Sequence, residues 1–263
     1  MLEQTQDYQQ KKAFFAKVIT VYGRKPALEV LRDESLQIYR LHFASSNKSS
    51  ADLVEIEALA QRRGIDIKTH KRAELARISR NSRQDQGVAV DVMCHALTQF
   101  NEWHNAWAQQ EQRPRVVLIA LDGVTNSQNL GMIIRSCCAA GVDGILLPTK
   151  GAAGLNPLTI KASAGSVFKA PIIVCPSLPL ALQHLSEHRL PIFALKANAE
   201  RNLFATQLGG SAVFVLGNES LGVSPEIAGY CTDSLAIPMY NGVESLNVAV
   251  AAALIAYHAH SQR

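Results

Sequence analysis

The sequence lacks the features typical of membrane, secreted and metal-dependent proteins. None of its apolar runs, within 263 residues, reaches the roughly 18–20 residues that a membrane span needs. The first twelve residues lack the apolar core of a secretory signal, so a cytoplasmic protein without membrane association is expected. Five cysteines form no CxxC pair and eight histidines are dispersed, which favours small buried cysteines over disulfides and predicts no metal site. Because no GxGxxG follows a strand-like run, a Rossmann dinucleotide site is unsupported.

Composition predicts an ordinary globular protein with an uneven charge distribution. Hydrophobic residues make up 48% and charged residues 18%, which is typical of a soluble chain of one or two domains. The net charge is only +4, yet residues 61–83 carry eight Lys or Arg and two acids. Tyr22, Arg24 and Lys25 form a second basic spot. Such an excess suits a solvated helix face or a phosphate-binding surface, and composition leaves both open.

The first third of the chain predicts a small α/β domain after a tail. Residues 1–17 are polar and Gln-rich, so we expect a flexible tail with a short helix near Phe14 and Phe15. From residue 18 to residue 93, helical and strand-like patterns alternate. The helical segments are 23–32, 51–63 and 71–79, and the strand-like segments are 38–43, 65–67 and 88–90. Gly64 stands where a helix C-terminus favours a left-handed residue.

Residues 94–114 are predicted to link two domains through an aromatic helix. Phe100, Trp103 and Trp107 recur at helical spacing, on one face. Aromatic side chains on a linker can stack on nucleic-acid bases, but they more often pack a connecting helix onto a domain, and we favour packing.

Residues 115–263 predict a parallel α/β sheet. The continuous apolar run 116–121 is typical of a central strand that is buried on both faces. Further strand-like runs are 145–147, 172–174, 192–195 and 213–216, and helical segments are 129–140 and 156–162. Ligands of such sheets bind outside the carboxyl ends of the strands.

The end of the chain places polar residues at such strand ends. Residues 213–216 lead into a turn with Gly217 and Glu219, and a second apolar run ends at residues 237–239. A loop then precedes Ser245, which begins a segment predicted as the terminal helix. We therefore expect a pocket formed by two strand ends and one helix start.

Three separated motifs resemble those of a known family. They are NLGMIIR at residues 129–135, LGNESLG at residues 216–222, and IPM at residues 237–239 with SLN at residues 245–247. In this order they resemble the SpoU (TrmH-type) family of RNA ribose 2′-O-methyltransferases, members of the SPOUT class, which use S-adenosylmethionine. The resemblance covers the chain from residue 116 onward, and more loosely the part before it.

The resemblance implies a fold with two parts. It predicts an N-terminal RNA-binding domain like ribosomal protein L30e at residues 18–93, which serves as the SpoU substrate-binding domain. It also predicts a C-terminal SPOUT domain at residues 115–263, with a parallel sheet and a deep trefoil knot, in a homodimer. RNA contacts are expected from four basic residues near the ends of the first domain: Arg24, Lys25, Arg80 and Arg83.

The resemblance also assigns the cofactor pocket and the catalytic residues. The S-adenosylmethionine pocket is expected to be lined by Leu216, Gly217, Ile237, Met239 and Leu246. The catalytic group is expected to comprise Arg135, Asn129, Glu219, Ser245 and Asn247.

Roles within the catalytic group follow from side-chain chemistry. A guanidinium has a pKa above about 12, so Arg135 is expected to orient the target phosphate and stabilise the 2′-oxyanion, with any base role assisted by that phosphate. Asn129 lies six residues earlier and is predicted on the same side of its helix. Glu219 could orient Arg135 or the ribose, while Ser245 and Asn247 offer hydrogen bonds, and Ser245 could also cap the last helix.

The predicted activity is methyl transfer from S-adenosylmethionine to a ribose 2′-OH of RNA. Ribosomal RNA of the 23S type is preferred because of the N-terminal domain; alternatives are a tRNA 2′-O-methyltransferase and a non-catalytic RNA-binding protein. A non-catalytic protein would show damage in the motifs, yet Asn129, Arg135, Glu219 and Asn247 are present. Ser220 and Ala249 depart from the glycine and serine that the family often has, which concerns specificity more than activity.

Overall fold

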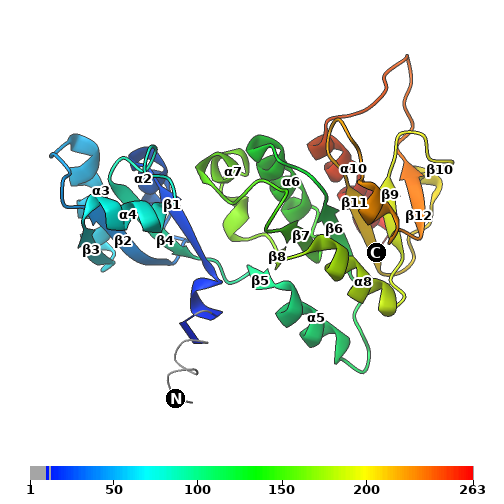
Figure 1. Cartoon of the computed structure of the whole chain (residues 1–263), viewed down its shortest axis with the longest axis horizontal. Helices are drawn as coiled ribbons and strands as arrows, with labels where there is room; N and C mark the ends of the chain where they lie inside the picture. Colours follow the sequence, from blue (N-terminus) through cyan, green and yellow to red (C-terminus); the bar gives the residue numbers. More distant parts are fainter. Residues whose placement is uncertain (1–9, 12, 263) are drawn as a thin grey trace. The chain divides into compact units, whose positions relative to one another are not determined.

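A computed structural model describes residues 10–11 and 13–262, which divide into two compact units, Met1–His95 and Ala96–Arg263 (Figure 1). Most of the predicted flexible tail, residues 1–9 and 12, lies outside the described residues. Residues 13–15 are helical, and the Phe14 ring packs edge-on against Tyr39 with centroids 4.7 Å apart. In the part of the chain that is described, no helix is long and apolar enough to cross a membrane.

The first unit is an α/β unit built on a four-stranded sheet of order β1-β4-β2-β3. Strand β4 is antiparallel to both its neighbours, while β2 and β3 are parallel. The strands are β1 (Val18–Tyr22), β2 (Ile38–Ala44), β3 (Asp66–His70) and β4 (Val88–Met93), and the helices are α2 (Arg24–Arg32), α3 (Ala51–Arg62) and α4 (Arg72–Ser79). Ser50 caps α3, and Gly64 follows its end with a φ of +64°, as its position predicts.

The second unit contains a fully parallel sheet, for which the described residues give the order β10-β12-β9-β11-β6-β7-β8-β5. Its strands are β5 (Thr98–Gln99), β6 (Val117–Leu121), β7 (Gly144–Pro148), β8 (Ile172–Cys175), β9 (Ile192–Leu195), β10 (Arg201–Asn202), β11 (Ala212–Leu216) and β12 (Asp233–Ala236). Its α-helices are α5 (Phe100–Ala108), α6 (Ser127–Ala139), α7 (Pro157–Ala162), α8 (Leu178–Glu187), α9 (Pro225–Ala228) and α10 (Val248–Ser261). The predicted parallel sheet is therefore confirmed.

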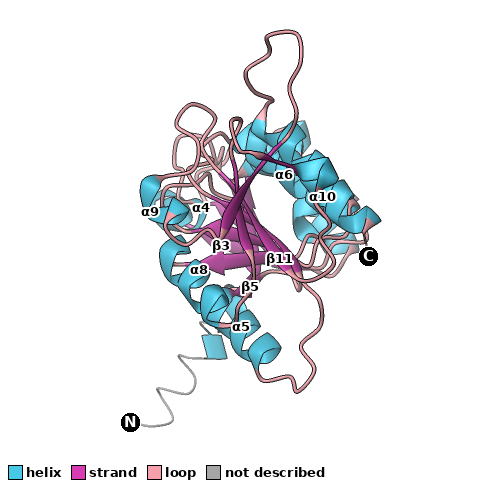
Figure 2. Cartoon of the chain, turned by 90° about the vertical axis from the view of Figure 1, so that its right-hand side faces the viewer, coloured by secondary structure: helices cyan, strands magenta, loops and turns pink. Residues whose placement is uncertain are grey.

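Helices cover both faces of this sheet, as Figure 2 shows, with α5, α8 and α9 on one side and α6 and α10 on the other. Leu118 and Ala120 of β6 pack in one core cluster with the α5 and α8 side chains. Ile119 lies between them on the strand and is also fully buried, so β6 is apolar on both faces. This two-sided burial explains the continuous apolar run in the sequence.

The aromatic residues of the expected linker belong to the core of the second unit. Phe100 is 3% exposed and Trp107 is 5% exposed, and both pack against side chains of the sheet and α8. The prediction that this helix packs onto a domain is confirmed. Helix α6 begins at Ser127, earlier than predicted, because the Asn126 side chain accepts hydrogen bonds from the backbone of residues 128 and 129. The trefoil knot stays a prediction.

Candidate active site

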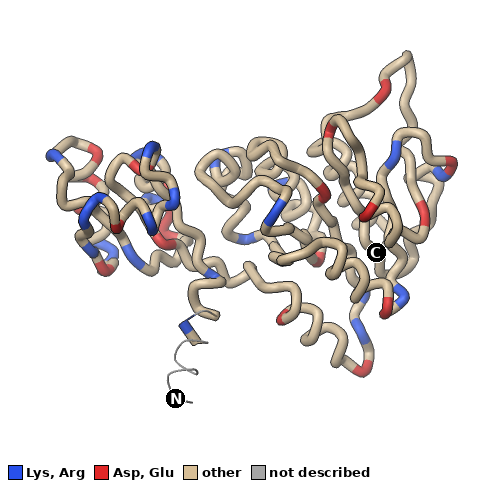
Figure 3. The backbone as a smooth tube through the Cα atoms, in the orientation of Figure 1, with Lys and Arg blue, Asp and Glu red and all other residues tan. Residues whose placement is uncertain are grey.

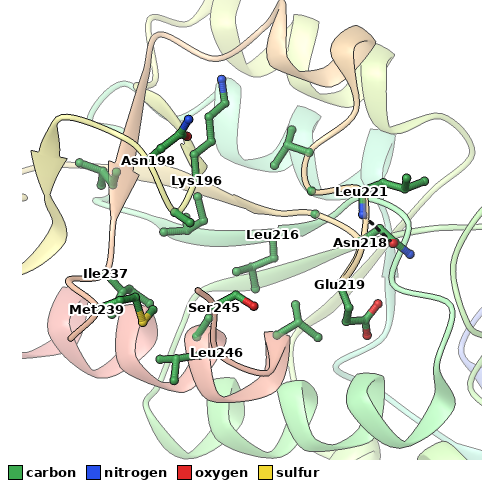
Figure 4. Close-up of a pocket in the computed structure, with 18 residues that line it drawn as sticks. Lys196, Asn198, Leu216, Asn218, Glu219, Leu221, Ile237, Met239, Ser245 and Leu246 are labelled. Carbon is green, nitrogen blue, oxygen red and sulfur yellow. Dashed lines mark hydrogen bonds between the residues drawn. The ribbon is translucent and has the colours of Figure 1, made fainter. Parts of the chain in front are cut away.

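A cavity of about 420 Å³ opens at the carboxyl ends of β9, β11 and β12, as Figure 4 shows in close-up. Its volume lies within the roughly 300–1,000 Å³ typical of small-molecule sites. All five predicted cofactor residues line it: Leu216, Gly217, Ile237, Met239 and Leu246. Glu219 and Ser245, which were predicted as catalytic, line it as well. The strand-end prediction therefore located this pocket.

The turn after β11 is folded tightly on itself, and this requires Gly217. A Cβ added at Gly217 would lie 2.1 Å from the carbonyl carbon of Gly222. Asn218 and Gly222 exchange backbone hydrogen bonds of 3.0 and 2.8 Å. The Asn218 side chain accepts from the backbone N–H of Ser220 at 2.9 Å and donates to the Gly123 carbonyl at 2.9 Å. The turn is thus fixed both internally and to the loop after β6.

Asp122, at the end of β6, holds the other side of this turn. Its carboxylate accepts from the backbone N–H of Ser224 at 2.7 Å, and its own N–H donates to the Leu216 carbonyl at 2.8 Å. None of the three motifs includes Asp122. An acid that directly follows a buried strand was the available signal. Lys196 and Asn198, which follow β9 and line the cavity, were also not predicted from the sequence.

Side chains from all three motifs meet beside the cavity. The Asn129 amide Nδ2 donates to Oε1 of Glu219 at 2.5 Å, and its Oδ1 accepts from Nδ2 of Asn247 at 3.1 Å. Asn247 Oδ1 in turn accepts from the backbone N–H of Ala249 at 2.9 Å and so caps α10. Since a carboxylate can only accept, the Asn129 amide must present its N–H₂ to Glu219, which fixes the orientation of the whole chain of bonds.

One of the expected roles is corrected by these contacts, because Asn247, not Ser245, is the N-cap of α10. Glu219 accepts from Asn129, and within one copy no hydrogen bond or ion pair joins it to Arg135 among the described residues. Its role toward Arg135 or the ribose stays a prediction.

The position of Arg135 also differs from the prediction. Six residues of α-helix turn through about 600°, so Arg135 lies roughly 120° around α6 from Asn129 rather than on the same side. Arg135 is exposed and is not among the residues that line the cavity. Its side chain makes no hydrogen bond or ion pair within residues 10–11 and 13–262. The lining of the cavity in one copy of the chain therefore does not include this guanidinium.

In the first unit, the two basic spots lie next to each other. The Arg24 guanidinium donates to the Gln86 carbonyl at 3.3 Å and to Ser50 Oγ at 3.1 Å, so it is held within the fold. The Tyr22 hydroxyl accepts from Asn81 Nδ2 at 3.1 Å, which joins β1 to the loop after α4. Three of the four predicted RNA-binding residues are exposed there: Lys25, Arg80 and Arg83.

Burial makes three of the four cysteines of the second unit unsuited to nucleophilic chemistry. Burial raises the pKa of Cys137 and of Cys175 to about 12, and that of Cys231 to about 11. At neutral pH these side chains are thiols, whereas the thiolate is the reactive form. The prediction of small buried cysteines agrees with these environments.

The fold and the cavity define a two-unit α/β protein with a cofactor-sized pocket in its parallel-sheet unit. Residues 116–257 match the SpoU rRNA methylase family, and residues 20–93 match a domain described as RNA 2′-O ribose methyltransferase substrate binding. The chain belongs to the SpoU family and is thus an RNA methyltransferase.

Relatives that align with most of this chain support this membership. A Mycobacterium avium protein named as an uncharacterized tRNA/rRNA methyltransferase is 31% identical over 244 residues, which cover 93% of this chain and 77% of that protein. The 23S rRNA (guanosine-2′-O-)-methyltransferase RlmB of Xanthomonas campestris is 32% identical over 211 residues, with coverages of 80% and 84%.

A solved structure shows the same fold. The SpoU methyltransferase AviRb from Streptomyces viridochromogenes, in complex with AdoMet, aligns with a TM-score of 0.63 at 20% sequence identity. The alignment covers 94% of this chain and 91% of AviRb.

Proposed function

We propose that this protein transfers a methyl group from S-adenosylmethionine to a ribose 2′-OH in ribosomal RNA of the 23S type. One observation carries the proposal: residues from three distant motifs converge, through Asn129, Glu219 and Asn247, beside a cavity that suits the cofactor. The Xanthomonas relative, named for guanosine 2′-O-methylation of 23S rRNA, supports the choice of RNA.

The cavity fits the chemistry of the cofactor. Figure 4 shows Ile237 and Met239 on one side of the pocket and Glu219 on the other, with Leu216 and Ser245 between them. Apolar side chains of the lining can enclose a neutral adenine. The Glu219 carboxylate supplies a negative charge that suits the positive charge of the sulfonium. When bound, the cofactor supplies the methyl group.

The residues beside the cavity would position the ribose. Glu219 accepts one hydrogen bond from Asn129 and retains acceptor capacity for a ribose hydroxyl. Asn129 in turn is held by Asn247, so this carboxylate is fixed in orientation before substrate binds. We propose that Glu219 orients the 2′-OH and that Ser245 offers a further hydrogen bond at the pocket wall.

Arg135 would be supplied by a second copy of the chain. Arg135 lies outside its own cavity, yet its helix α6 packs against α10 beneath the motif residues. Both helices expose large apolar side chains: Met132 is 41%, Val250 47% and Tyr257 52% exposed. Apolar exposure of this kind suits an interface between copies. In the resulting homodimer, Arg135 of one copy would hold the target phosphate at the other copy's site, where bidentate geometry favours arginine.

The first unit would dock the RNA. Lys25, Arg80 and Arg83 project from adjoining segments and can neutralise backbone phosphates. Arg24 would support this surface, since its guanidinium is bonded within the fold. The cytoplasmic location stays a prediction.

The test is transfer of tritiated methyl groups from S-adenosylmethionine to separate pools of unmodified rRNA and tRNA. We expect label in rRNA, its loss in Arg135→Ala, and its retention in Lys169→Ala, which removes an exposed cation elsewhere on the second unit. Label in tRNA alone would show that the substrate is tRNA rather than rRNA. The name of the Mycobacterium relative includes both kinds of RNA. Failure to bind the cofactor would contradict the enzyme reading itself.

A further inference from the structure

A second cavity, of about 430 Å³, lies at the opposite edge of the parallel sheet. Ala212, at the amino end of β11, lines it, while Leu216, at the carboxyl end of the same strand, lines the cofactor pocket. Four strand steps separate these residues, which corresponds to roughly 13 Å. The residues proposed for methyl transfer lie at the other end of the strand, so the proposed reaction does not use this second cavity.

The walls of the second cavity are positively charged. Arg113 and Arg189 line it, and its described lining includes no aspartate or glutamate. Both arginines are exposed, and Figure 3 marks basic positions on the segment between α5 and β6 that carries Arg113. The Arg113 guanidinium lies over the Trp107 ring, 5.3 Å from its centroid, and donates to Nδ1 of His188 at 2.9 Å. Arg113 is thus held at the cavity wall by an aromatic ring and an imidazole, and among the described residues no acid forms an ion pair with it.

Backbone donors add to this charge. Gly209 and Gly210 line the cavity, are exposed, and have only open space where a Cβ would lie. Among the described residues their N–H groups find no hydrogen-bond partner. Arg115 donates to the carbonyls of Leu208 and Gly210. These two hydrogen bonds anchor the loop through its carbonyl groups. Exposed N–H groups beside guanidinium groups are the donor set that phosphate oxygens favour.

We propose that this cavity binds a backbone phosphate of an RNA strand, at a site separate from the methyl-transfer pocket. Its ligand is a phosphodiester group, held by Arg113 and Arg189 and by the N–H groups of the Gly209–Gly210 loop. The choice of RNA over a free nucleotide rests on the proposed function, because a polynucleotide that reaches the cofactor pocket can extend around the edge of the same unit. The cavity then anchors the substrate RNA away from the reacting nucleotide.

Tryptophan fluorescence reports on this cavity specifically. The chain has two tryptophans, Trp103 and Trp107. Their rings are stacked with centroids 5.8 Å apart, Trp107 lines the second cavity, and neither residue lines the cofactor pocket. Titrating the full-length, cofactor-free protein with a single-stranded RNA decamer, AMP or inorganic phosphate therefore separates occupancy of this cavity from catalysis.

We expect the decamer to change the fluorescence at low salt, with a salt dependence set by its phosphate contacts. The double variant Arg113→Gln, Arg189→Asn should weaken this binding about 10-fold. It should also reduce the slope of log K against log salt by roughly 0.7, because one phosphate contact of a single strand is lost. Asparagine is chosen at Arg189 because that residue has a φ of +59°, which asparagine tolerates. Arg113→Lys with Arg189→Lys should restore most of the affinity, and Lys169→Gln should match wild type.

Three results would overturn the proposal. One is a fluorescence signal from AMP or phosphate but none from RNA, which would make a free phosphate compound the ligand. Another is equal RNA affinity in wild type and in the double variant, provided that the variant binds S-adenosylmethionine normally and is therefore folded. The third is no fluorescence response to RNA in a protein that methylates RNA. A fluorescence response without methyl transfer would instead contradict the proposed function and leave this site standing.

Discussion

Replacing Gly217 by alanine is the substitution that should most directly damage the cofactor pocket. A Cβ at this position would lie 2.1 Å from the carbonyl carbon of Gly222 and 2.2 Å from the nitrogen of Val223. Both are backbone atoms, so no side-chain rotation can relieve the contact. Ordinary contact begins at 3.4 Å, and 3.4 minus 2.1 gives a required displacement of 1.3 Å. The turn that carries Glu219 would have to open by at least this distance.

The energetic effect should appear in both stability and binding. Forcing extra carbon into a packed site costs about 1–3 kcal/mol, so we expect the melting temperature of Gly217→Ala to fall. Because the displaced turn lines the pocket, S-adenosylmethionine should also bind at least about tenfold more weakly, which corresponds to about 1.4 kcal/mol. Isothermal titration calorimetry and thermal unfolding on the same samples would measure both quantities.

Gly154→Ala is the matched control for this prediction. A Cβ at Gly154 would meet nothing within 4 Å, and its backbone does not need the left-handed region. This variant should bind the cofactor as wild type does. If Gly217→Ala also bound S-adenosylmethionine with wild-type affinity and unchanged melting temperature, the tight turn would not be what shapes the pocket.

Three further predictions concern the catalytic group and the pH dependence of stability. Asn129→Asp would replace the 2.5 Å hydrogen bond to Glu219 by a second carboxylate. Because the two carboxylates repel each other, kcat should fall by about 100-fold while the affinity for the cofactor is kept. An unchanged kcat would exclude the role of Asn129 in positioning Glu219. Mixing Arg135→Ala with Gly217→Ala should restore part of the activity that each lacks alone, because one site of a mixed dimer then retains both groups; no recovery would place Arg135 in its own copy's site. Burial and two neighbouring histidines lower the pKa of His104 below 6.5, so the unfolded chain binds more protons and the free energy of unfolding should fall as the pH drops from about 7 to 5. Urea unfolding at both pH values should show a smaller fall in His104→Phe, and an equal fall would assign the effect to other groups.

The sequence predicted a pocket at these strand ends because its lining residues follow buried strands. Parallel strands bring their carboxyl ends to one edge, so the turn at Gly217 and the segment at Ile237 had to lie close together. The unbroken apolar run of β6 likewise predicted that this strand is buried on both faces.

Elements made by tertiary contacts were not predictable in the same way. Strand β10 has two exposed residues, Arg201 and Asn202, and exists because it pairs with β12. The Asn129–Glu219 hydrogen bond joins residues 90 positions apart, and no local pattern specifies such a pair. Helix α8 is different, since Leu178, Ala181, Leu182 and Leu185 are buried at helical spacing and its signal was present in the sequence.

The placement of Arg135 shows a limit of motif reasoning. Its motif was recognisable, but helix geometry turns it away from Asn129, and its own cavity does not include it. A second copy of the chain is not encoded in any local pattern, so the proposed contribution of its Arg135 rests on the family resemblance and on the exposed apolar side chains of α6 and α10.

The most direct test of the central claim is the chemical identity of the product. Unmodified 23S rRNA would be incubated with the protein and S-adenosylmethionine, digested to nucleosides, and analysed by mass spectrometry for the position of the new methyl group. The account predicts one 2′-O-methylribonucleoside, with its neighbouring phosphodiester resistant to alkali, and a lower yield of it from Gly217→Ala at the same cofactor concentration. A methyl group on a base, or an intact 2′-OH in every product nucleoside, would contradict it.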